Sequence, residues 1–211
     1  MKRVTALLLA AMMIITTGLI TPAMAAEDDV PETYSNAYVV MDAKTGQVLL
    51  QKNMYEKEYP ASITKILTTA LGLTYAKPED RITVSQETVS DVWKWGETTH
   101  LALEPGEIIT LKDALYGAMV ESANDCANAI AQAVSGSLTD FAELMNQQVA
   151  ALGLSDTHFT NAHGLPDKDH YTTAYDMYLI TMAALENETF REIVSTNYYY
   201  AGEDQNGNPL P

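Results

Sequence analysis

Ser62 and Lys65 are the residues whose types and spacing could do chemistry. They stand three positions apart in Pro60-Ala61-Ser62-Ile63-Thr64-Lys65, where a long apolar run begins. If that run is a helix, the two side chains share one face and can touch. A proline suits the entry to a helix, and the positive end of the helix dipole favours an alkoxide over a hydroxyl. The pair is therefore a candidate nucleophile and base.

A second polar group, Ser122-Ala123-Asn124, follows further along the chain. It falls at the junction of two predicted helices, and such a break can project side chains into a cleft. Ser122 would offer a hydroxyl relay there, and Asn124 a side-chain amide. Taken alone, this group is better interpreted as a helix N-cap. After Ser62 and Lys65, however, it completes a spacing that is typical of serine acyl-transfer enzymes.

The elements that must position these residues are a hairpin and a buried helix. Two β-rich runs, 36–41 and 47–51, flank Asp42-Ala43-Lys44-Thr45-Gly46, which predicts a hairpin with a positive φ at its glycine. Residues 62–75 have a helical pattern that is apolar on nearly all sides, as expected of a buried helix. Burial would take Lys65 out of bulk water.

The remaining pattern predicts an α+β fold from which part of the sheet is missing. A capping box at residues 110–113 opens one helix, and Thr139 is expected to cap another. The segment 91–106 is interpreted as irregular, with Trp93 and Trp95 as core anchors or, alternatively, as a groove wall. The other expected elements are helices at 124–134, 173–185 and 190–194 and strands at 82–84 and 197–200, the last without a partner.

The first 25 residues have the features of a secretory signal peptide. Lys2 and Arg3 precede a mostly apolar run, and Ala23-Met24-Ala25 is a small-residue cleavage site. An uncleaved membrane anchor is the alternative, but polar residues and a glycine interrupt the apolar run. Residues 26–35 are expected to form a flexible lead-in, and residues 36–211 a single domain.

Charge and cysteine content narrow the class of protein. The formal net charge is −16, and removal of Lys2 and Arg3 takes it to −18. So acidic a chain is a poor candidate for binding nucleic acid or an anionic membrane surface. Cys126 is the single cysteine and cannot form an internal disulfide; its Ala-rich helical surroundings predict a small buried thiol.

Over roughly residues 35–195, the chain resembles the secreted serine-type D-alanyl-D-alanine carboxypeptidases, which are low-molecular-mass penicillin-binding proteins. Residues 60–65 look like the family's nucleophile motif, and residues 122–125 like its second motif. The resemblance implies a β-lactamase/DD-peptidase-like fold, with an antiparallel sheet and a helical cluster. It is also carried by residues 37–49, Phe141, Met145-Asn146, Leu152-Gly153-Leu154, Thr157, Phe159, Gly164-Leu165 and residues 170–176.

The family's third motif, a Lys-Thr/Ser-Gly on a strand that lines the site, is expected after the second. The only Lys-Thr-Gly here, Lys44-Thr45-Gly46, precedes Ser62 and lies in the predicted hairpin turn, so it is rejected as catalytic. The true third motif is expected beyond Pro211, together with the C-terminal strands of the sheet, which leaves the catalytic domain at 36–211 incomplete. That motif should supply a cation for the substrate carboxylate and one oxyanion-hole amide.

The resemblance implies acyl transfer from a peptidoglycan stem peptide that ends in D-Ala-D-Ala. Ser62 would attack the carbonyl between the two D-alanines, and Lys65 would accept its proton. Ser122 would relay a proton to the leaving amine, and Asn124 would hold Lys65 or the substrate amide. Lys65 can act as base only when neutral, a state that burial and a neighbouring cation favour. β-Lactams would acylate the same serine. The implied enzyme needs no cofactor or metal and is secreted to the cell envelope.

Three alternatives remain open. A class A β-lactamase shares the Ser-x-x-Lys motif, and Glu143 with Asn146 superficially resembles its water-activating element, although Glu143 falls on the polar side of a predicted helix. An inactive cell-wall-binding fragment is compatible with the missing third motif. A metal-binding module is the third, because one loop holds five possible ligands, His158, His163, Asp167, Asp169 and His170.

Overall fold

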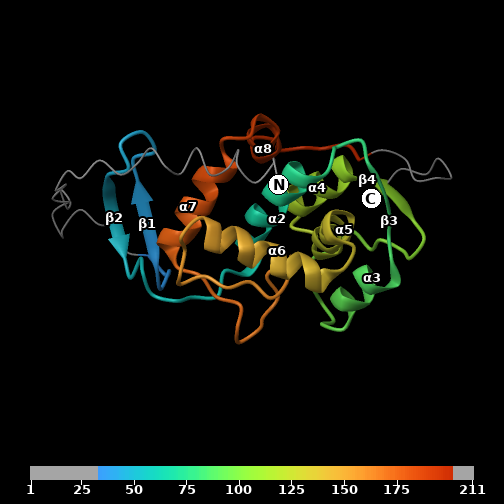
Figure 1. Cartoon of the computed structure of the whole chain (residues 1–211), viewed down its shortest axis with the longest axis horizontal. Helices are drawn as coiled ribbons and strands as arrows, with labels where there is room; N and C mark the ends of the chain where they lie inside the picture. Colours follow the sequence, from blue (N-terminus) through green and yellow to red (C-terminus); the bar gives the residue numbers. More distant parts are fainter. Residues whose placement is uncertain (1–32, 202–211) are drawn as a thin grey trace.

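The computed structural model describes residues 33–201 and is built around one central helix. The helix α2, Lys65–Tyr75, packs against α5, α4 and α7, and the short 3-10 turn η2, Ala61–Thr64, leads into it. Figure 1 shows the helical body between a two-stranded sheet at one end and a second one at the other. The predicted signal peptide and most of the predicted lead-in, like residues 202–211, lie outside the described residues.

The other elements follow in chain order. The strands are β1 (Tyr38–Met41), β2 (Val48–Lys52), β3 (Arg81–Thr83) and β4 (Ile108–Thr110), and the helices are α3 (Gln86–Trp93), α4 (Leu111–Val120), α5 (Asn124–Ser135), α6 (Leu138–Ala151), α7 (Ala174–Ala184) and α8 (Glu188–Val194).

The strands β1 and β2 form the predicted hairpin. They pair antiparallel with Tyr38 opposite Lys52, and the register shifts once near Met41. The Asp42 carboxylate accepts hydrogen bonds from the backbone N–H groups of Lys44 and Thr45, and Gly46 has the expected positive φ of 71°. Lys44-Thr45-Gly46 is therefore occupied in building a turn, as its sequence position predicts.

The helix α2 is buried as its apolar pattern predicts. Leu67 and Leu71 belong to one of two hydrophobic clusters, together with aromatic and aliphatic residues of α6 and α7. Gly72 lets α5 approach closely, because a Cβ there would lie 2.9 Å from the Ile130 side chain. This close packing fixes the start of α2 relative to the start of α5, and the two polar motifs lie at those two helix starts.

Three elements differ from the sequence-based expectation. Residues 91–93 are helical rather than irregular, because Ser85 caps α3 by accepting a hydrogen bond from the Thr88 N–H. The strand β4 was not expected; it pairs antiparallel with β3 and brings Ile82 opposite Ile109. The cap of α6 is Ser137, two residues before the predicted Thr139.

The expected strand at 197–200 does not form in the described part of the chain. Tyr199 instead stacks on the Tyr116 ring at a centroid distance of 3.8 Å and donates a hydrogen bond to Asp113. These side-chain contacts hold the segment on α4 without a ladder. A strand needs a partner for its backbone groups, and aromatic β-propensity alone does not supply one.

Trp93 and Trp95 are not core anchors. Their side chains are 48% and 44% exposed, so the prediction that they fill the core was wrong. The buried hydrophobic residues of the segment 85–106 are Val89, Val92 and Leu103. Within residues 33–201, no helix combines the length and apolarity needed to cross a membrane.

Candidate active site

Ser62 and Lys65 meet at the junction of η2 and α2. Ser62 lies in the 3-10 turn rather than in the α-helix that the sequence predicts, and Lys65 is the first residue of α2. The Lys65 ammonium nitrogen Nζ is 3.1 Å from Ser62 Oγ. Ser62 is exposed, whereas Lys65 is only 1% exposed. The hydroxyl thus faces solvent, and the amine touches it from the interior.

Ser122 reaches the same amine from the turn between α4 and α5. Its Oγ lies 3.4 Å from Lys65 Nζ, and its φ of 59° is rare for a residue with a Cβ. Left-handed backbone at a non-glycine residue is uncommon and is concentrated at functional sites. The strained turn thereby directs the second serine toward Lys65.

The third hydrogen bond of Lys65 goes to the backbone carbonyl of His163, 3.0 Å away. This carbonyl belongs to the loop 159–171, which sequence reasoning noted only for its Asn, His, Gly and Pro content. The amine thus has two serine hydroxyls and one carbonyl around it. A carbonyl can only accept, so it orients the amine through one N–H and leaves the remaining positions for the two hydroxyls.

Burial lowers the pKa of Lys65 to about 8, although Cys126 and Asp125 act in the opposite direction. A lysine in water has a pKa near 10.5, so the neutral form is far more accessible here. At neutral pH roughly a tenth of the molecules hold a neutral amine. Desolvation is the main cause of this lowered pKa. The cation expected from the missing third motif is therefore not required for most of it.

Asn124 is buried at the start of α5, and its backbone N–H donates to the Thr99 carbonyl. Within residues 33–201, the hydrogen bonds of Lys65 go to Ser62, Ser122 and His163, not to Asn124.

The loop 159–171 is built to hold its own carbonyls in place. Asn161 Oδ1 accepts hydrogen bonds from the backbone N–H groups of His163 and Gly164. Gly164 has a φ of 90°, and a Cβ there would lie 1.8 Å from the Ala61 carbonyl oxygen. Only glycine permits the loop to approach the nucleophile turn so closely. The Asn-x-x-Gly spacing in the sequence was the available signal for this arrangement.

A hydrogen bond to the Asp91 carboxylate supports this loop from α3. His163 Nε2 lies 2.9 Å from Asp91 Oδ2, and Asn128 and Lys94 also donate to the Asp91 carboxylate. Burial raises the pKa of Asp91, but the hydrogen bonds from His163, Lys94 and Asn128 outweigh it and hold the pKa well below its usual range. Burial lowers the pKa of His163, opposed by Asp91.

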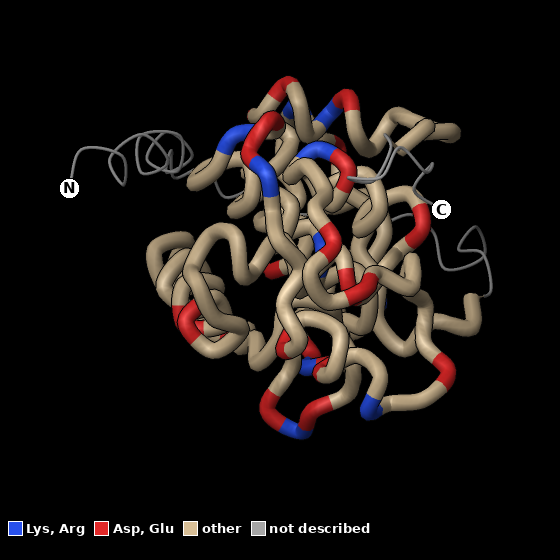
Figure 2. The backbone as a smooth tube through the Cα atoms, turned by 90° about the vertical axis from the view of Figure 1, so that its right-hand side faces the viewer, with Lys and Arg blue, Asp and Glu red and all other residues tan. Residues whose placement is uncertain are grey.

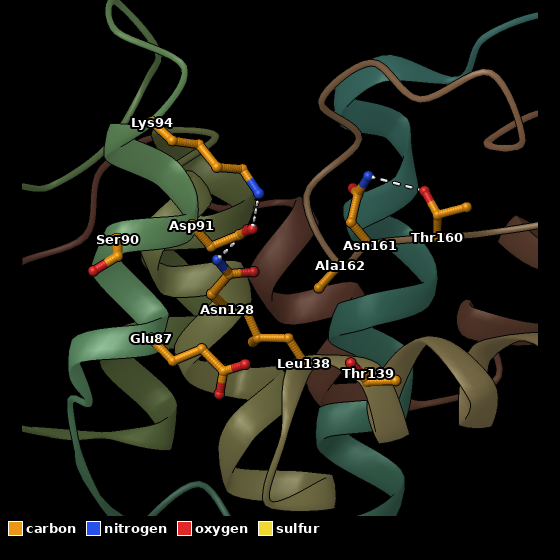
Figure 3. A pocket seen from close by; sticks show the side chains of 10 residues that line it. All are labelled: Glu87, Ser90, Asp91, Lys94, Asn128, Leu138, Thr139, Thr160, Asn161 and Ala162. Atoms are coloured by element: carbon orange, nitrogen blue, oxygen red, sulfur yellow. Dashed lines mark hydrogen bonds and ion pairs between the residues drawn. The ribbon is translucent and has the colours of Figure 1, made fainter.

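A cavity of about 400 Å³ opens beside the Asp91 carboxylate. Figure 3 shows Lys94 and Asn128 converging on Asp91 on one side of it, and Asn161 beside Thr160 on the other. A second cavity, of about 430 Å³, lies on the other face of the loop between Tyr59, Ala61 and His170. The loop that holds Lys65 thus forms a wall of both cavities.

The five possible metal ligands do not converge. His158 Nδ1 pairs with the Asp169 carbonyl, His163 pairs with Asp91, and His170 pairs with Thr64 and Thr160. Among the described residues no group of three His, Cys, Asp or Glu side chains is arranged to hold a metal. The crowding of these residues in sequence reflects separate structural contacts.

The remaining sequence candidates have structural surroundings. Glu143 is exposed on α6, while Asn146 faces inward and hydrogen-bonds both backbone groups of Phe159. This pair does not form a water-activating element. Cys126 is 1% exposed, and burial raises the pKa of its thiol, which fits the predicted inert role.

Comparisons with known proteins identify the family. Residues 23–206 match the family model described as D-alanyl-D-alanine carboxypeptidase. The D-alanyl-D-alanine carboxypeptidase DacF of Bacillus subtilis is 34% identical over an alignment of 214 residues. The alignment covers 97% of this chain and 53% of the relative. DacC of Escherichia coli is 35% identical over 177 residues, which cover 78% of this chain and 43% of the relative.

Solved structures agree on the fold. A mutant of the Streptomyces K15 DD-transpeptidase is similar with a TM-score of 0.78 at 27% identity, over 86% of this chain and 73% of that one. Penicillin-binding protein 6B of Escherichia coli gives a TM-score of 0.74 at 29% identity, over 83% of this chain and 58% of that one. The chain spans about half the length of the curated relatives it matches. It has the DD-peptidase fold and belongs to the D-alanyl-D-alanine carboxypeptidase family.

Proposed function

We propose that this protein is a serine D-Ala-D-Ala carboxypeptidase that works through an acyl-enzyme on Ser62. The observation that carries the proposal is the buried Lys65 amine, which lies within hydrogen-bond distance of both Ser62 Oγ and Ser122 Oγ. One amine between two hydroxyls can take a proton from the nucleophile and pass one on through the relay. Family membership supports the same reaction class.

The reaction begins when neutral Lys65 removes the Ser62 proton as Oγ attacks the carbonyl between the two D-alanines. The C–O bond forms, and the carbonyl oxygen becomes an oxyanion that the Ser62 backbone N–H stabilises. Ser122 relays a proton from Lys65 to the leaving nitrogen as the intermediate collapses, so that the C–N bond breaks and D-alanine departs as a neutral amine. Water hydrolyses the resulting ester and restores the serine.

The proposal also covers binding and location. Asn124 is assigned the substrate amide, and the peptidoglycan stem peptide and β-lactams are the proposed partners of Ser62. The described acidic residues are spread over many segments of the chain (Figure 2), and the net charge of −16 is in keeping with a protein that binds neither nucleic acid nor an anionic surface. Residues 1–25 are proposed to direct secretion, and residues 36–211 to belong to the catalytic domain.

The experiment measures D-alanine release from an acylated tripeptide that ends in D-Ala-D-Ala, with the protein expressed from its whole gene. Release is expected from the wild type, with a loss of at least about 10³-fold in Ser62→Ala. The same peptide ending in D-Ala-L-Ala is the substrate control. Wild-type protein that releases no D-alanine, or faster turnover of a penicillin than of the peptide, contradicts the proposal.

A further inference from the structure

We propose that His170 is a positioning residue for the Ser62 nucleophile, which it serves by fastening the nucleophile turn to the loop that holds Lys65. The inference rests on the proposed function of Ser62. Its direct contact is Thr64, one of the two residues between the nucleophile and the base: Thr64 Oγ1 lies 2.8 Å from His170 Nε2. Both residues are almost fully buried, at 0% and 1% exposure.

The backbone of the same loop fixes which ring nitrogen carries the proton. The Thr160 N–H donates to His170 Nδ1 at 3.1 Å, so Nδ1 is an acceptor. A neutral imidazole with an acceptor Nδ1 carries its proton on Nε2. Nε2–H therefore donates to the Thr64 hydroxyl. The ring joins a backbone group of one segment to a side chain of the other, and it does so only in the neutral form.

Two further contacts connect the same loop to the nucleophile turn and to Lys65. The Gly164 backbone packs on the Ala61 carbonyl, one residue before the nucleophile, and the His163 carbonyl accepts from Lys65. A fourth contact joins the loop to α2, where the Ala162 carbonyl accepts a hydrogen bond from Thr68 Oγ1. Of these four contacts, that of His170 is the one to which the loop contributes a side chain. If the join opens, Ser62 and the carbonyl that orients Lys65 move relative to each other.

No other assigned task accounts for His170. It lies outside the Ser62, Lys65 and Ser122 cluster and does not share a metal-like group with His158 or His163 among the described residues. The rings of Phe159 and His170 pack edge to face with their centroids 5.3 Å apart, and this contact restricts the plane of the imidazole. If His170 only filled space, a side chain of the same shape would be sufficient. If it positions the nucleophile turn, the hydrogen-bond donor at Nε2 is required.

Two isosteric variants separate these possibilities. His170→Gln places an amide near the position of Nε2 and retains a donor for Thr64, while it gives up the acceptor for Thr160. His170→Asn places its amide near Nδ1, so it retains the acceptor and loses the donor. His158→Asn, which changes a half-buried histidine of the same region, is the matched control.

The measurement is acylation by a fluorescent penicillin, resolved into noncovalent affinity and the first-order acylation rate. We expect His170→Asn to lower the rate on the order of 100-fold with affinity changed by less than about threefold, because misplaced reacting groups lose rate rather than binding. We expect His170→Gln and His158→Asn to stay within about threefold of wild type in both. Equal losses in the Gln and Asn variants, or no loss in either, overturns the inference.

A second readout does not depend on acylation. Amide hydrogen exchange over residues 61–66 is expected to accelerate at least about tenfold in His170→Asn and to stay near the wild-type rate in His170→Gln. A wild-type protein that never labels contradicts the proposed function, and exchange then decides the inference alone. Unchanged exchange in His170→Asn contradicts the fastening role whatever the labelling shows.

Discussion

Two segments meet the candidate site from opposite directions, and they are held by different means. The loop 159–171 contacts Lys65, and the segment 94–107 contacts the start of α5 that follows Ser122. The first is packed against the nucleophile turn with no room for a methyl group at Gly164. The second carries exposed Trp95 near its start. The part that orients the base is rigid, and the part beside the second serine is open.

The anchors explain the difference. Asn146, Asn161 and His170 fasten the loop 159–171 at three separated points through side chain to backbone hydrogen bonds. The middle of the segment 94–107 is held by Asp125, a fully buried carboxylate that accepts from the N–H groups of Leu101 and Leu103. Its other links are backbone hydrogen bonds, from Asn124 to the Thr99 carbonyl and between Val84 and residues 106–107. Side-chain anchors are therefore dispersed along the first loop and concentrated at one residue for the second segment.

The largest expected effect breaks the rigid loop. Gly164→Ala places a Cβ at 1.8 Å from the Ala61 carbonyl oxygen in a backbone with φ of 90°. We expect the free energy of unfolding to fall by more than about 4 kcal/mol, since neither backbone segment can yield cheaply. Chemical denaturation measures it.

Gly153→Ala is the matched control for that change. Gly153 also has a positive φ, 74°, but no atom lies within 4 Å of a Cβ there. Only backbone strain is added, so a loss of about 1–2 kcal/mol is expected. Equal losses in the two variants would show that the loop does not pack on the nucleophile turn as described.

The second effect breaks the open segment. Asp125→Asn replaces a carboxylate that accepts from three backbone N–H groups, those of Leu101, Leu103 and Cys126. A loss of about 3 kcal/mol is expected, because an amide can offer only one oxygen and adds buried donors. Asp140→Asn, at an exposed helix start, should change stability by about 0.5 kcal/mol. A loss in Asp125→Asn as small as in Asp140→Asn would show that Asp125 does not anchor this segment.

These anchors also mark the limit of what the sequence could predict. The hairpin, the buried helix after Ser62, the capping box at Thr110 and the meeting of Ser62 with Lys65 follow from local patterns, and the structure agrees with them. The His163 carbonyl could not be foreseen, because a backbone group 98 residues away has no side-chain signature.

Whether a tryptophan is buried and whether a strand forms also depend on residues that are far away in the sequence. Trp93 and Trp95 are large and apolar, yet the helix α3 and its following turn direct them outward. The pattern at 197–200 is strand-like, but its fate depends on a neighbouring strand. Local chemistry predicts which residues are capable of a role, and tertiary packing selects among them.

The third effect is a dependence of stability on pH that arises in the rigid loop. Burial, with additional contributions from His163 and His158, lowers the pKa of His170 from 6.5 to about 4, while Asp167 acts in the opposite direction. From Thr64 it faces only an uncharged hydroxyl. The unfolded chain binds this proton first, so stability is full above pH 6.5 and falls as the pH drops toward 4.

Between pH 7 and pH 5 the loss from His170 should be about 2 kcal/mol. Urea denaturation of wild type and His170→Gln at several pH values checks this, because the variant has no proton to take up at this position. The free energy of unfolding of wild type should fall by about 2 kcal/mol relative to that of the variant between pH 7 and pH 5. A difference that stays constant across this range would contradict the assignment.

The smallest effect compares an aromatic residue from each segment. Trp95→Ala is expected to lower the free energy of unfolding by less than about 1 kcal/mol, since the side chain is 44% exposed. Phe159→Ala, at 0% exposure in the rigid loop, should lose about 3–5 kcal/mol. Thermal or urea denaturation of both variants provides the comparison. Similar losses would mean that the two segments are equally well packed.

The measurement that tests the central claim most directly is the pH dependence of acylation at one residue. A β-lactam is reacted with the protein from its whole gene, and the adduct is located by mass spectrometry of the peptide that contains Ser62. The adduct is expected on Ser62, at a rate that rises with pH and levels off above about 8, because burial lowers the pKa of Lys65 to about 8 and only the neutral amine accepts the proton. An adduct on another residue, or a rate that does not change through pH 8, would contradict the assignment of Ser62 as nucleophile and Lys65 as its base.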